Sequence, residues 1–482
     1  MLFRWLSKLI LPLFSVLFLF MITFSLFLQN LSLGLISCIL LVIMVIIFGF
    51  NKFNSRFTLI LFSISYFVFL VGGLISQLFT SNGSNNINFT PEVLFNTTII
   101  LIVALLSILV GFVFSEKSFV KKDETLAVTN DSVNRLRLKK MIGKVSLGLF
   151  FISLFPTLYL VMDKIIFLSG NLYTDLYLNY SGVPIIIERF GQVFKVSFYS
   201  FLSTLPTKKE ARLPIFCYLG VNILNLFTGQ RATTVIAFLV ILFYFVYRNK
   251  IDGIKFTQKG SWISQTQIVI LTLSSPIIIA ALAFINYIRD GKSYGNFNIL
   301  SLFLEFFEKQ GVSVNLISYA QTLNFPSTNS SYTLGPLINL VRNSVFVQSL
   351  TDIPPIVQQT VYGAMYGNNF AYTVSYLVIP RMYLNGGGLG SSYLAELYVD
   401  FGMVSIIIFN LLIGIILNYI SNYKGTRSWM LTIILLMLEA ILFMPRSSAL
   451  GFITSAFNAT TLLTLLVIYL LAELGMKIKE FK

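Results

Sequence analysis

Histidine is absent from the 482 residues of this chain, and charged residues are scarce. Without histidine the chain lacks the commonest general base and the commonest ligand of transition metals. The two cysteines, Cys38 and Cys217, lie in apolar segments, so the sequence implies no disulfide framework and no cysteine metal site. Charged residues make up 11% of the chain, against about 25% in soluble domains. This composition excludes soluble enzymes, secreted disulfide scaffolds and disordered chains.

Hydrophobic residues make up 56% of the chain, and they gather in runs long enough to cross a bilayer. We predict an all-α polytopic membrane protein with about 12 transmembrane helices and one large, partly helical extracytoplasmic loop. The least apolar segment, 183–205, carries Glu188, Arg189 and Lys195. The predicted spans are 9–28, 31–50, 57–79, 93–114, 145–162, 183–205, 213–228, 232–247, 268–288, 401–420, 429–444 and 449–472.

The distribution of Lys and Arg predicts the orientation of these spans. With the N-terminus in the cytoplasm, most of the 34 basic residues fall on the inner side, as the positive-inside rule requires. Both termini are then cytoplasmic, and the +15 net charge reflects membrane orientation, so no nucleic-acid partner is expected. We expect an N-terminal transmembrane bundle (1–288, with a cytoplasmic loop at 115–144), a large extracytoplasmic loop (289–400), and C-terminal spans with a short cytoplasmic tail (401–482).

Several arginines lie at the outer ends of apolar segments, where the positive-inside rule disfavours them. An arginine at such a boundary can extend its side chain to lipid head groups and have no other role. Several guanidinium groups converging at the outer leaflet would instead suit a lipid-linked diphosphate, because each presents paired donors to phosphate oxygens. These arginines are Arg189, Arg231, Arg289, Arg381 and Arg446.

A glycine-rich stretch precedes the span predicted at 401–420. Backbone N–H groups near Gly390 and Ser391 can approach an anion closely, although the same glycines suit an ordinary turn before a helix. Helical geometry is expected from Ser392 onward, which places Glu396 and Asp400 on one face. Glu396 is a candidate catalytic base or a partner of Arg381 or Arg446, and the alternative is a plain interfacial carboxylate.

Three stretches, GQRATT, GLGSSYLAELYVDFG and a late PRSS, resemble the Wzy-type O-antigen and capsule polymerases that join oligosaccharide repeat units. The resemblance implies a C-type glycosyltransferase in the bacterial plasma membrane, acting at its outer face on repeat units linked to undecaprenyl diphosphate. Its products would be O-antigen of lipopolysaccharide, capsule or exopolysaccharide. A flippase and a chain-length regulator are further partners that the resemblance implies.

By position in these motifs, Arg231 and Arg446 match the family's functional arginines, and Glu396 lies in its Gly-Ser to Ala-Glu stretch. Arg189, Arg289 and Arg381 match by location alone. We therefore predict Glu396, Arg231 and Arg446 as catalytic residues, without a metal or cofactor. The predicted substrate-binding residues are Arg189, Arg289, Arg381, Gly390, Ser391 and Tyr393.

Two other functions fit the architecture. A flippase for the same lipid-linked oligosaccharide has a similar number of spans, although transporters are commonly built as repeats around a midplane site, and the long outer loop interrupts any such division. An outer-leaflet ligase is the other alternative. O-antigen ligases use a histidine near their site, and its absence here disfavours that function.

Overall fold

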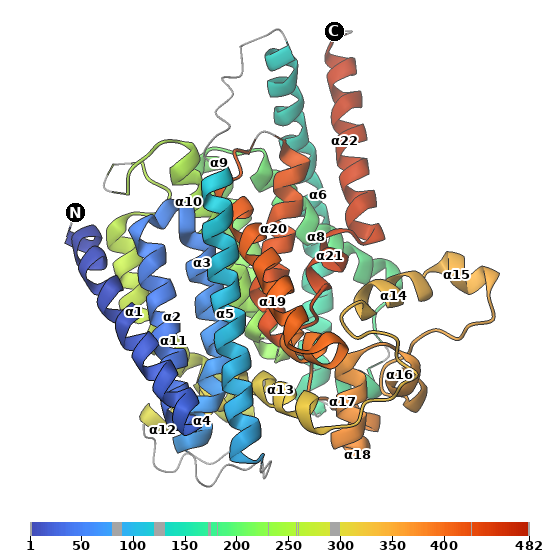
Figure 1. The fold of residues 1–482 in the computed structure, drawn as a ribbon. Helices are drawn as coiled ribbons and strands as arrows, with labels where there is room; N and C mark the ends of the chain where they lie inside the picture. Colours follow the sequence, from blue (N-terminus) through green and yellow to red (C-terminus); the bar gives the residue numbers. More distant parts are fainter. Residues whose placement is uncertain are drawn as a thin grey trace.

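The protein is a helical bundle in which long helices run side by side (Figure 1). A computed structural model describes residues 2–79, 89–119, 131–171, 175–180, 182–229, 231–256, 258, 260–289, 299–425 and 427–480. No strand occurs in these residues. The long helices are α1 (Leu2–Leu28), α2 (Leu31–Asn51), α3 (Phe53–Tyr66), α5 (Pro91–Phe119), α6 (Asp131–Gly170), α8 (Ile185–Ser203), α9 (Lys208–Leu224), α10 (Arg231–Ile251), α11 (Gln265–Arg289), α19 (Tyr393–Asn422), α20 (Ser428–Phe443) and α22 (Ala459–Glu480).

Shorter helices extend or connect the long ones. A π-helical turn, η1 (Phe67–Val71), joins α3 to α4 (Gly72–Phe79), and two 3₁₀ turns, η2 (Asn225–Thr228) and η3 (Met444–Arg446), follow α9 and α20. The others are α7 (Asp175–Leu178), α12 (Ile299–Gln310), α13 (Ser313–Thr322), α14 (Gly335–Arg342), α15 (Val345–Leu350), α16 (Val361–Tyr366), α17 (Phe370–Val378), α18 (Pro380–Leu384) and α21 (Gly451–Ala456).

Ten helical segments of the described residues are long and apolar enough to cross a membrane. They coincide with ten of the twelve predicted spans and confirm an all-helical, multi-pass protein. The two remaining predictions, 183–205 and 268–288, correspond to α8 and α11, which are helices but not among the ten. The three charged residues of α8 explain this, and for α11 the side chains after 281 lie outside the described residues. Membrane crossing by these two helices stays a prediction.

Two glycines let α5 and α19 pack with their backbones in contact. A Cβ atom on Gly111 would lie 2.1 Å from the carbonyl oxygen of Leu411, and one on Gly414 would lie 2.2 Å from that of Ile108. No larger residue fits at either position without separating the helices, so this pair fixes the position of α19 in the bundle. Gly402, at φ 62° and ψ −148°, interrupts the regular helix and sets its first turns at an angle to the rest.

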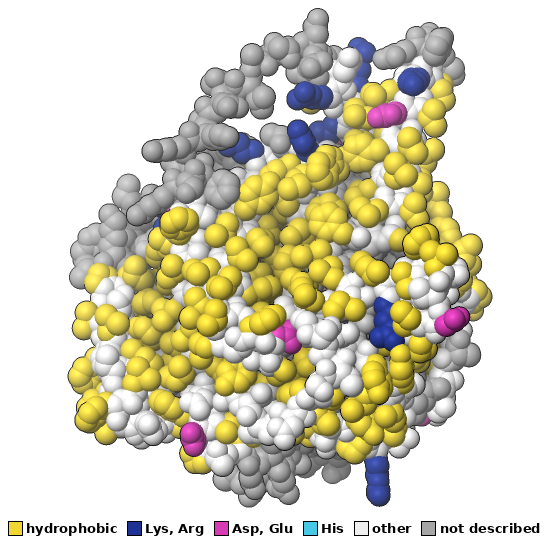
Figure 2. Space-filling view, turned by 45° about the vertical axis from the view of Figure 1, so that its right-hand side comes forward, with side chains coloured by type: hydrophobic (Ala, Val, Ile, Leu, Met, Phe, Trp, Pro, Cys, Tyr) yellow, Lys and Arg dark blue, Asp and Glu magenta, His cyan; other side chains and the backbone are white. Residues whose placement is uncertain are grey.

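Hydrophobic side chains cover much of the surface, as expected for a protein surrounded by lipid (Figure 2). Lys and Arg gather at the end where α6 and α22 project beyond the bundle (Figures 1 and 2). There α6 and α22 pack through Ile142, Ile468 and Ala472. The predicted cytoplasmic end also contains an ion pair in which Arg56 lies 2.7 Å from Glu116.

Between α11 and α19 the chain forms the helices α12 to α18, gathered at the opposite end of the bundle (Figure 1). The first of them contacts the spans directly: a Cβ atom on Gly73 of α4 would lie 2.3 Å from the carbonyl oxygen of Gly311, just after α12. This part of the chain is thus a folded layer that packs on the bundle, and it contacts the residues predicted to carry the chemistry.

Candidate functional site

Glu396 lies in the first turn of α19 and is buried, with 2% of its surface exposed. Gly390 has φ +80°, which favours glycine and lets the chain turn before Ser392 caps the helix. Ser391 then donates a hydrogen bond from Oγ to Glu396 Oε1 at 2.6 Å. The helix begins at Tyr393, one residue after the expected start, with Ser392 as its extended N-cap residue, and the glycine-rich turn places the Ser391 hydroxyl against the carboxylate.

The second oxygen of Glu396 binds a different part of the chain. The backbone N–H of Ala449 donates to Glu396 Oε2 at 2.8 Å. Ala449 is fully buried in the connection between α20 and α21, three residues after Arg446. The carboxylate thus joins the start of α19 to the connection that carries the PRSS motif, and two stretches singled out in the sequence meet at one side chain. We call Ser391, Glu396, Ala449 and Arg446 the junction.

Arg446 extends from the junction to the layer of short helices. Its NH1 group donates to the carbonyl oxygen of Gln310 at 3.1 Å and to the Gln310 side-chain Oε1 at 2.9 Å. These acceptors are at the last residue of α12, where the helix dipole favours a cation. The guanidinium carbon also lies 6.0 Å from the ring centre of Phe69 in η1. Arg446 is therefore oriented by two elements besides its own.

Arg231 is the first residue of α10 and is 9% exposed. It follows Gly229, which has φ 83° and ends the 3₁₀ turn η2. Thr234 of the same helix donates to the carbonyl oxygen of Asn222 at 2.6 Å, which fixes the start of α10 against α9. The side chain is thus held at a buried helix N-terminus, away from the bulk aqueous phase.

Helix α12 lies between the two arginine motifs. Its residue Phe306 packs with Leu226 of η2 and Val235 of α10, next to the turn that carries Arg231. Its C-terminal residue, Gln310, receives Arg446. The GQRATT and PRSS motifs are far apart in the sequence. Helix α12 packs against residues on either side of the first motif and accepts a hydrogen bond from the arginine of the second.

The other predicted substrate-binding residues have different surroundings. Arg189 is exposed and donates to Thr460 Oγ1 of α22 at 3.5 Å. Arg381 is exposed on α18. Arg289 is the last residue of α11, and its side chain lies outside the described residues. Tyr393 is fully buried, and its hydroxyl donates to Asn410 Oδ1 at 2.8 Å, on the far side of the Gly402 interruption.

Asp400, one turn after Glu396, binds the turn at residues 331–333, which precedes α14. Its carboxylate accepts hydrogen bonds from Ser331 Oγ at 2.6 Å and from the backbone N–H groups of Tyr332 and Thr333 at 3.0 and 2.7 Å. Burial, with a contribution from Asp400, raises the pKa of Tyr332, so this phenol is protonated at neutral pH. The sequence singled out Asp400 but not its partners, although the run of Ser, Thr and Asn before residue 334 is typical of turns that bind carboxylates.

Carboxylates, cysteines and histidines do not gather into groups of three or more anywhere in the described parts of the chain. The charged groups that the structure brings to the junction are one carboxylate and one guanidinium. The Arg446 guanidinium can bind an anion, whereas the Glu396 carboxyl group orders a backbone turn through Ala449 and can exchange a proton through the Ser391 hydroxyl.

Ten apolar helices of spanning length define this chain as a multi-pass membrane protein. The model of the family described as O-antigen polysaccharide polymerase Wzy matches residues 10–479, and the chain belongs to this family. Neither the curated proteins nor the solved structures contain a match to the chain. The resemblance noted in the three motifs is thereby confirmed at the level of the family.

Proposed function

We propose that this protein is an integral membrane glycosyltransferase that polymerises oligosaccharide repeat units linked to undecaprenyl diphosphate, at the outer face of the bacterial plasma membrane. The observation that carries the proposal is the family match over residues 10–479, which includes both motifs that meet at Glu396. Family membership favours polymerisation over the flippase and ligase alternatives. The products are O-antigen, capsule or related exopolysaccharide.

The proposed reaction transfers the growing chain to a new unit. An acceptor hydroxyl attacks the anomeric carbon of the donor sugar, the bond from that carbon to the diphosphate oxygen breaks, and undecaprenyl diphosphate departs with the electron pair. Arg446 and Arg231 stabilise the charge that develops on the diphosphate, as a metal ion does in other transferases. Two observations support this role: Arg231 is 9% exposed, and Arg446 is oriented by its hydrogen bonds to Gln310.

The proton of the acceptor hydroxyl must also be removed. Glu396 is 2% exposed and already accepts a hydrogen bond from Ser391. We therefore assign Ser391 as the relay: its oxygen accepts the substrate proton while its own proton passes to Glu396. The same carboxylate keeps the connection after Arg446 in place through Ala449. Gly390 precedes Ser391 directly and would present its backbone to the substrate at the junction. Substrate binding by Arg189, Arg289 and Arg381 rests on their predicted position at the outer boundary alone.

The first experiment is complementation of a deletion strain. The deletion is expected to leave single repeat units on the lipid carrier and at the cell surface, and the intact gene to restore polymer. Arg231→Ala and Arg446→Ala are expected to insert normally and leave single units. Arg212→Ala, an exposed arginine in α9, is the matched control and should restore polymer. Full polymer in either of the first two variants contradicts the assignment, and absence of any surface unit in the deletion strain indicates a flippase.

A second experiment tests the side of the membrane. In a Cys38→Ala, Cys217→Ala background, Ser330→Cys should react with an impermeant thiol reagent applied to intact cells, and Lys209→Cys should react only after lysis. Both positions are exposed, so accessibility within the fold does not limit the reaction. Labelling of position 209 in intact cells would reverse the orientation and contradict the outer-face proposal.

A further inference from the structure

In the segment from α14 to α15, large apolar side chains point outward, whereas the outward side chains of a helix in contact with water are mostly polar. Its largest apolar side chains point away from the protein: Phe346 is 72% exposed, Leu350 67% and Val341 60%. Leu334, Leu340 and Ile353 are also exposed, at 45%, 43% and 47%. A surface in contact with water rarely presents so many large apolar side chains together.

The amide side chains of the same segment bind backbone groups. Asn339 donates to the carbonyl oxygen of Gly367 at 2.7 Å, and Gln348 donates to that of Arg342 at 2.8 Å. Asn343 accepts from the backbone N–H of Ile356 at 2.9 Å. These amides are therefore satisfied by backbone groups of the loop, while Asn343 and Ser349 stay exposed beside the large apolar side chains.

The charge of Arg342 is also directed into the protein. Its guanidinium donates to the carbonyl oxygens of Tyr366 and Pro354, at 2.9 and 3.2 Å, and to the hydroxyl of Tyr362 at 2.5 Å. Arg342 is the one charged residue between Leu334 and Leu350. Between Leu334 and Leu350 the segment therefore carries no charge apart from Arg342, and the next charged residue, Asp352, is exposed and would lie among the lipid head groups.

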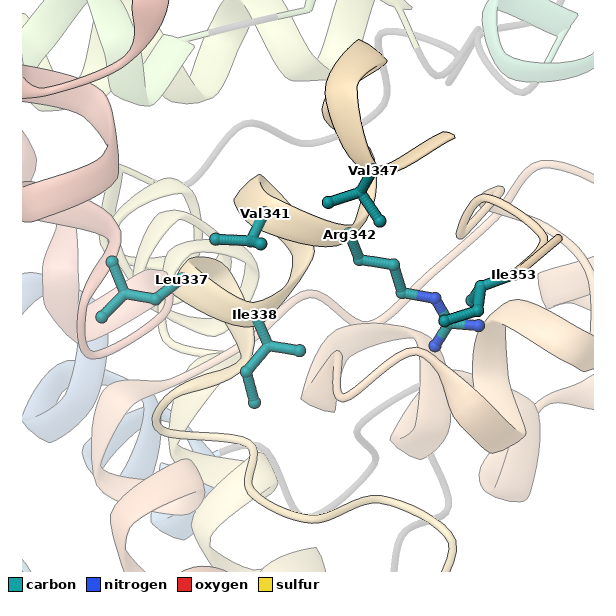
Figure 3. Close-up of a pocket in the computed structure, with 6 residues that line it drawn as sticks. All are labelled: Leu337, Ile338, Val341, Arg342, Val347 and Ile353. Carbon is teal, nitrogen blue, oxygen red and sulfur yellow. The ribbon is translucent and has the colours of Figure 1, made fainter. Parts of the chain in front are cut away.

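A cavity of about 600 Å³ lies between α14 and α15 (Figure 3). Leu337, Ile338 and Val341 extend from α14, Val347 from α15, and Arg342 reaches toward Ile353. The cavity is open to the exterior and its lining is mostly apolar. It has the chemistry of a site for a flexible hydrocarbon chain.

The position of the segment indicates where this hydrocarbon comes from. Helix α14 packs against α21, the first part of the apolar segment Gly451–Ile478 that is long enough to cross the membrane. In Figure 1, α14 and α15 project sideways beside the start of α21 and α22, whereas α18 lies at the far end of the layer of short helices. The apolar face of α14 and α15 thus adjoins α21 and α22, and Leu462, Leu463 and Leu466 of α22 are also exposed.

We propose that α14 and α15 lie in the lipid interface at the end of the membrane where α21 begins, with Phe346, Leu350 and Val341 among the acyl chains and an acyl chain in the cavity. An amphipathic segment in this position anchors the layer of short helices to the bilayer. The inference needs the chain to be embedded in a membrane and does not depend on the reaction that it catalyses.

Spin-label accessibility tests this placement. Phe346→Cys, Leu350→Cys and Asn385→Cys, each in a Cys38→Ala, Cys217→Ala background, are labelled with a nitroxide and placed in nanodiscs of phosphatidylcholine and phosphatidylglycerol. Asn385 is the matched control, because it is exposed at the end of α18. Collisions with oxygen relative to a nickel chelate should be at least about fivefold more frequent at 346 and 350 than at 385, since oxygen partitions into lipid and the chelate into water.

Two results would overturn the proposal. Equal collision ratios at all three positions place the segment in water, and low collision rates with both reagents at 346 and 350 show that protein covers it. For the cavity, Val341→Trp places an indole at its open edge, in a background in which Trp5, Trp262 and Trp429 are replaced by Phe. Fluorescence of this variant should be quenched at least about twofold more by lipids with brominated acyl chains than that of Asn385→Trp in the same background. Equal quenching shows that no acyl chain reaches the cavity. Neither readout involves sugar transfer, so failure here is separate from failure of the proposed function.

Discussion

The α17–α19 region and the α14–α15 segment lie in the same part of the chain but differ in the exposure of their aromatic rings. Phe370, at the start of α17, is 1% exposed and stacks on Phe325 with ring centres 5.4 Å apart. Phe346 of α15 is 72% exposed. At the start of α19, Glu396 is buried and Asp400 half-buried, and both accept hydrogen bonds from backbone N–H groups, whereas α14 and α15 turn their large apolar side chains outward.

Side chains in or near a membrane have little contact with water, and the two regions are stabilised under this condition in different ways. A carboxylate with little access to water is stabilised when hydrogen-bond donors surround it, as at Asp400. An apolar side chain that is not buried by protein is stable when lipid covers it. Substitutions in the two regions should therefore lower the free energy of unfolding by very different amounts.

The largest expected effect on stability is that of Phe370→Ala. Removing a buried ring that contacts Phe325 and Tyr332 should lower the free energy of unfolding by about 3–5 kcal/mol. The measurement is unfolding by SDS in mixed micelles. Phe325→Leu, which keeps most of the apolar volume on the other side of the contact, should cost clearly less. A loss below that of Phe325→Leu would show that this layer is not packed as described.

Glu396→Gln is expected to have the second largest effect on stability. The amide replaces one carboxylate oxygen by an NH₂ group, so either Ser391 or Ala449 loses a charge-assisted acceptor, at a cost of about 2–3 kcal/mol. Polymer should be lost, while binding of lipid-linked donor, measured on purified protein, should fall less than in Arg446→Ala. Glu92→Gln, an exposed glutamate in the first turn of α5, is the control. Polymer of normal length in Glu396→Gln would remove it from both proposed roles.

Asp400→Asn should have a smaller effect. Asparagine keeps one oxygen acceptor, so one of the three donors of Ser331, Tyr332 and Thr333 loses its partner, and the expected cost is about 1–2 kcal/mol. Faster proteolysis near residue 331 would report the loosened turn. Asp352→Asn provides the comparison, because Asp352 is exposed. Equal stability of the two variants would mean that Asp400 does not hold this turn.

Phe346→Ala is expected to have the smallest effect, below about 0.5 kcal/mol in the same assay, because its ring makes few contacts with protein. A loss comparable to that of Phe370→Ala would show that Phe346 is buried in the native protein. The comparison between the two regions would then have to be abandoned, together with the proposed lipid contact.

The sequence predicted the helical class and ten of the spans because runs of apolar residues are a local property of the chain. It was least informative at α8, where charge argued against a span. Lys195 lies 2.9 Å from Glu439, and Tyr199 donates to the same carboxylate at 2.7 Å. The partner that neutralises Lys195 is Glu439 of α20, which lies far away in the sequence. The residues around 195 therefore do not predict it.

The candidate site was predictable in its residues but not in their contacts. The turn before Ser392 and the helical placement of Glu396 and Asp400 follow from local rules for glycine and helix capping. The sequence suggested Arg381 or Arg446 as partners of Glu396, whereas the carboxylate accepts hydrogen bonds from Ser391 and from the Ala449 backbone. Nearly every residue has a backbone N–H, so tertiary packing alone determines which of them donates to Glu396.

The hydrogen bond between Ala449 and Glu396 also has a consequence for the order in which the protein is made. The donor lies 53 residues after the acceptor, with the whole of α20 between them. While the ribosome is still translating α20, Glu396 has left it and lacks the Ala449 N–H that later satisfies one of its oxygens. The start of α19 therefore reaches its final state only when the hairpin of α20 and α21 has been translated and inserted. In the order of synthesis, α20 and the connection to α21 thus complete a site that α19 began.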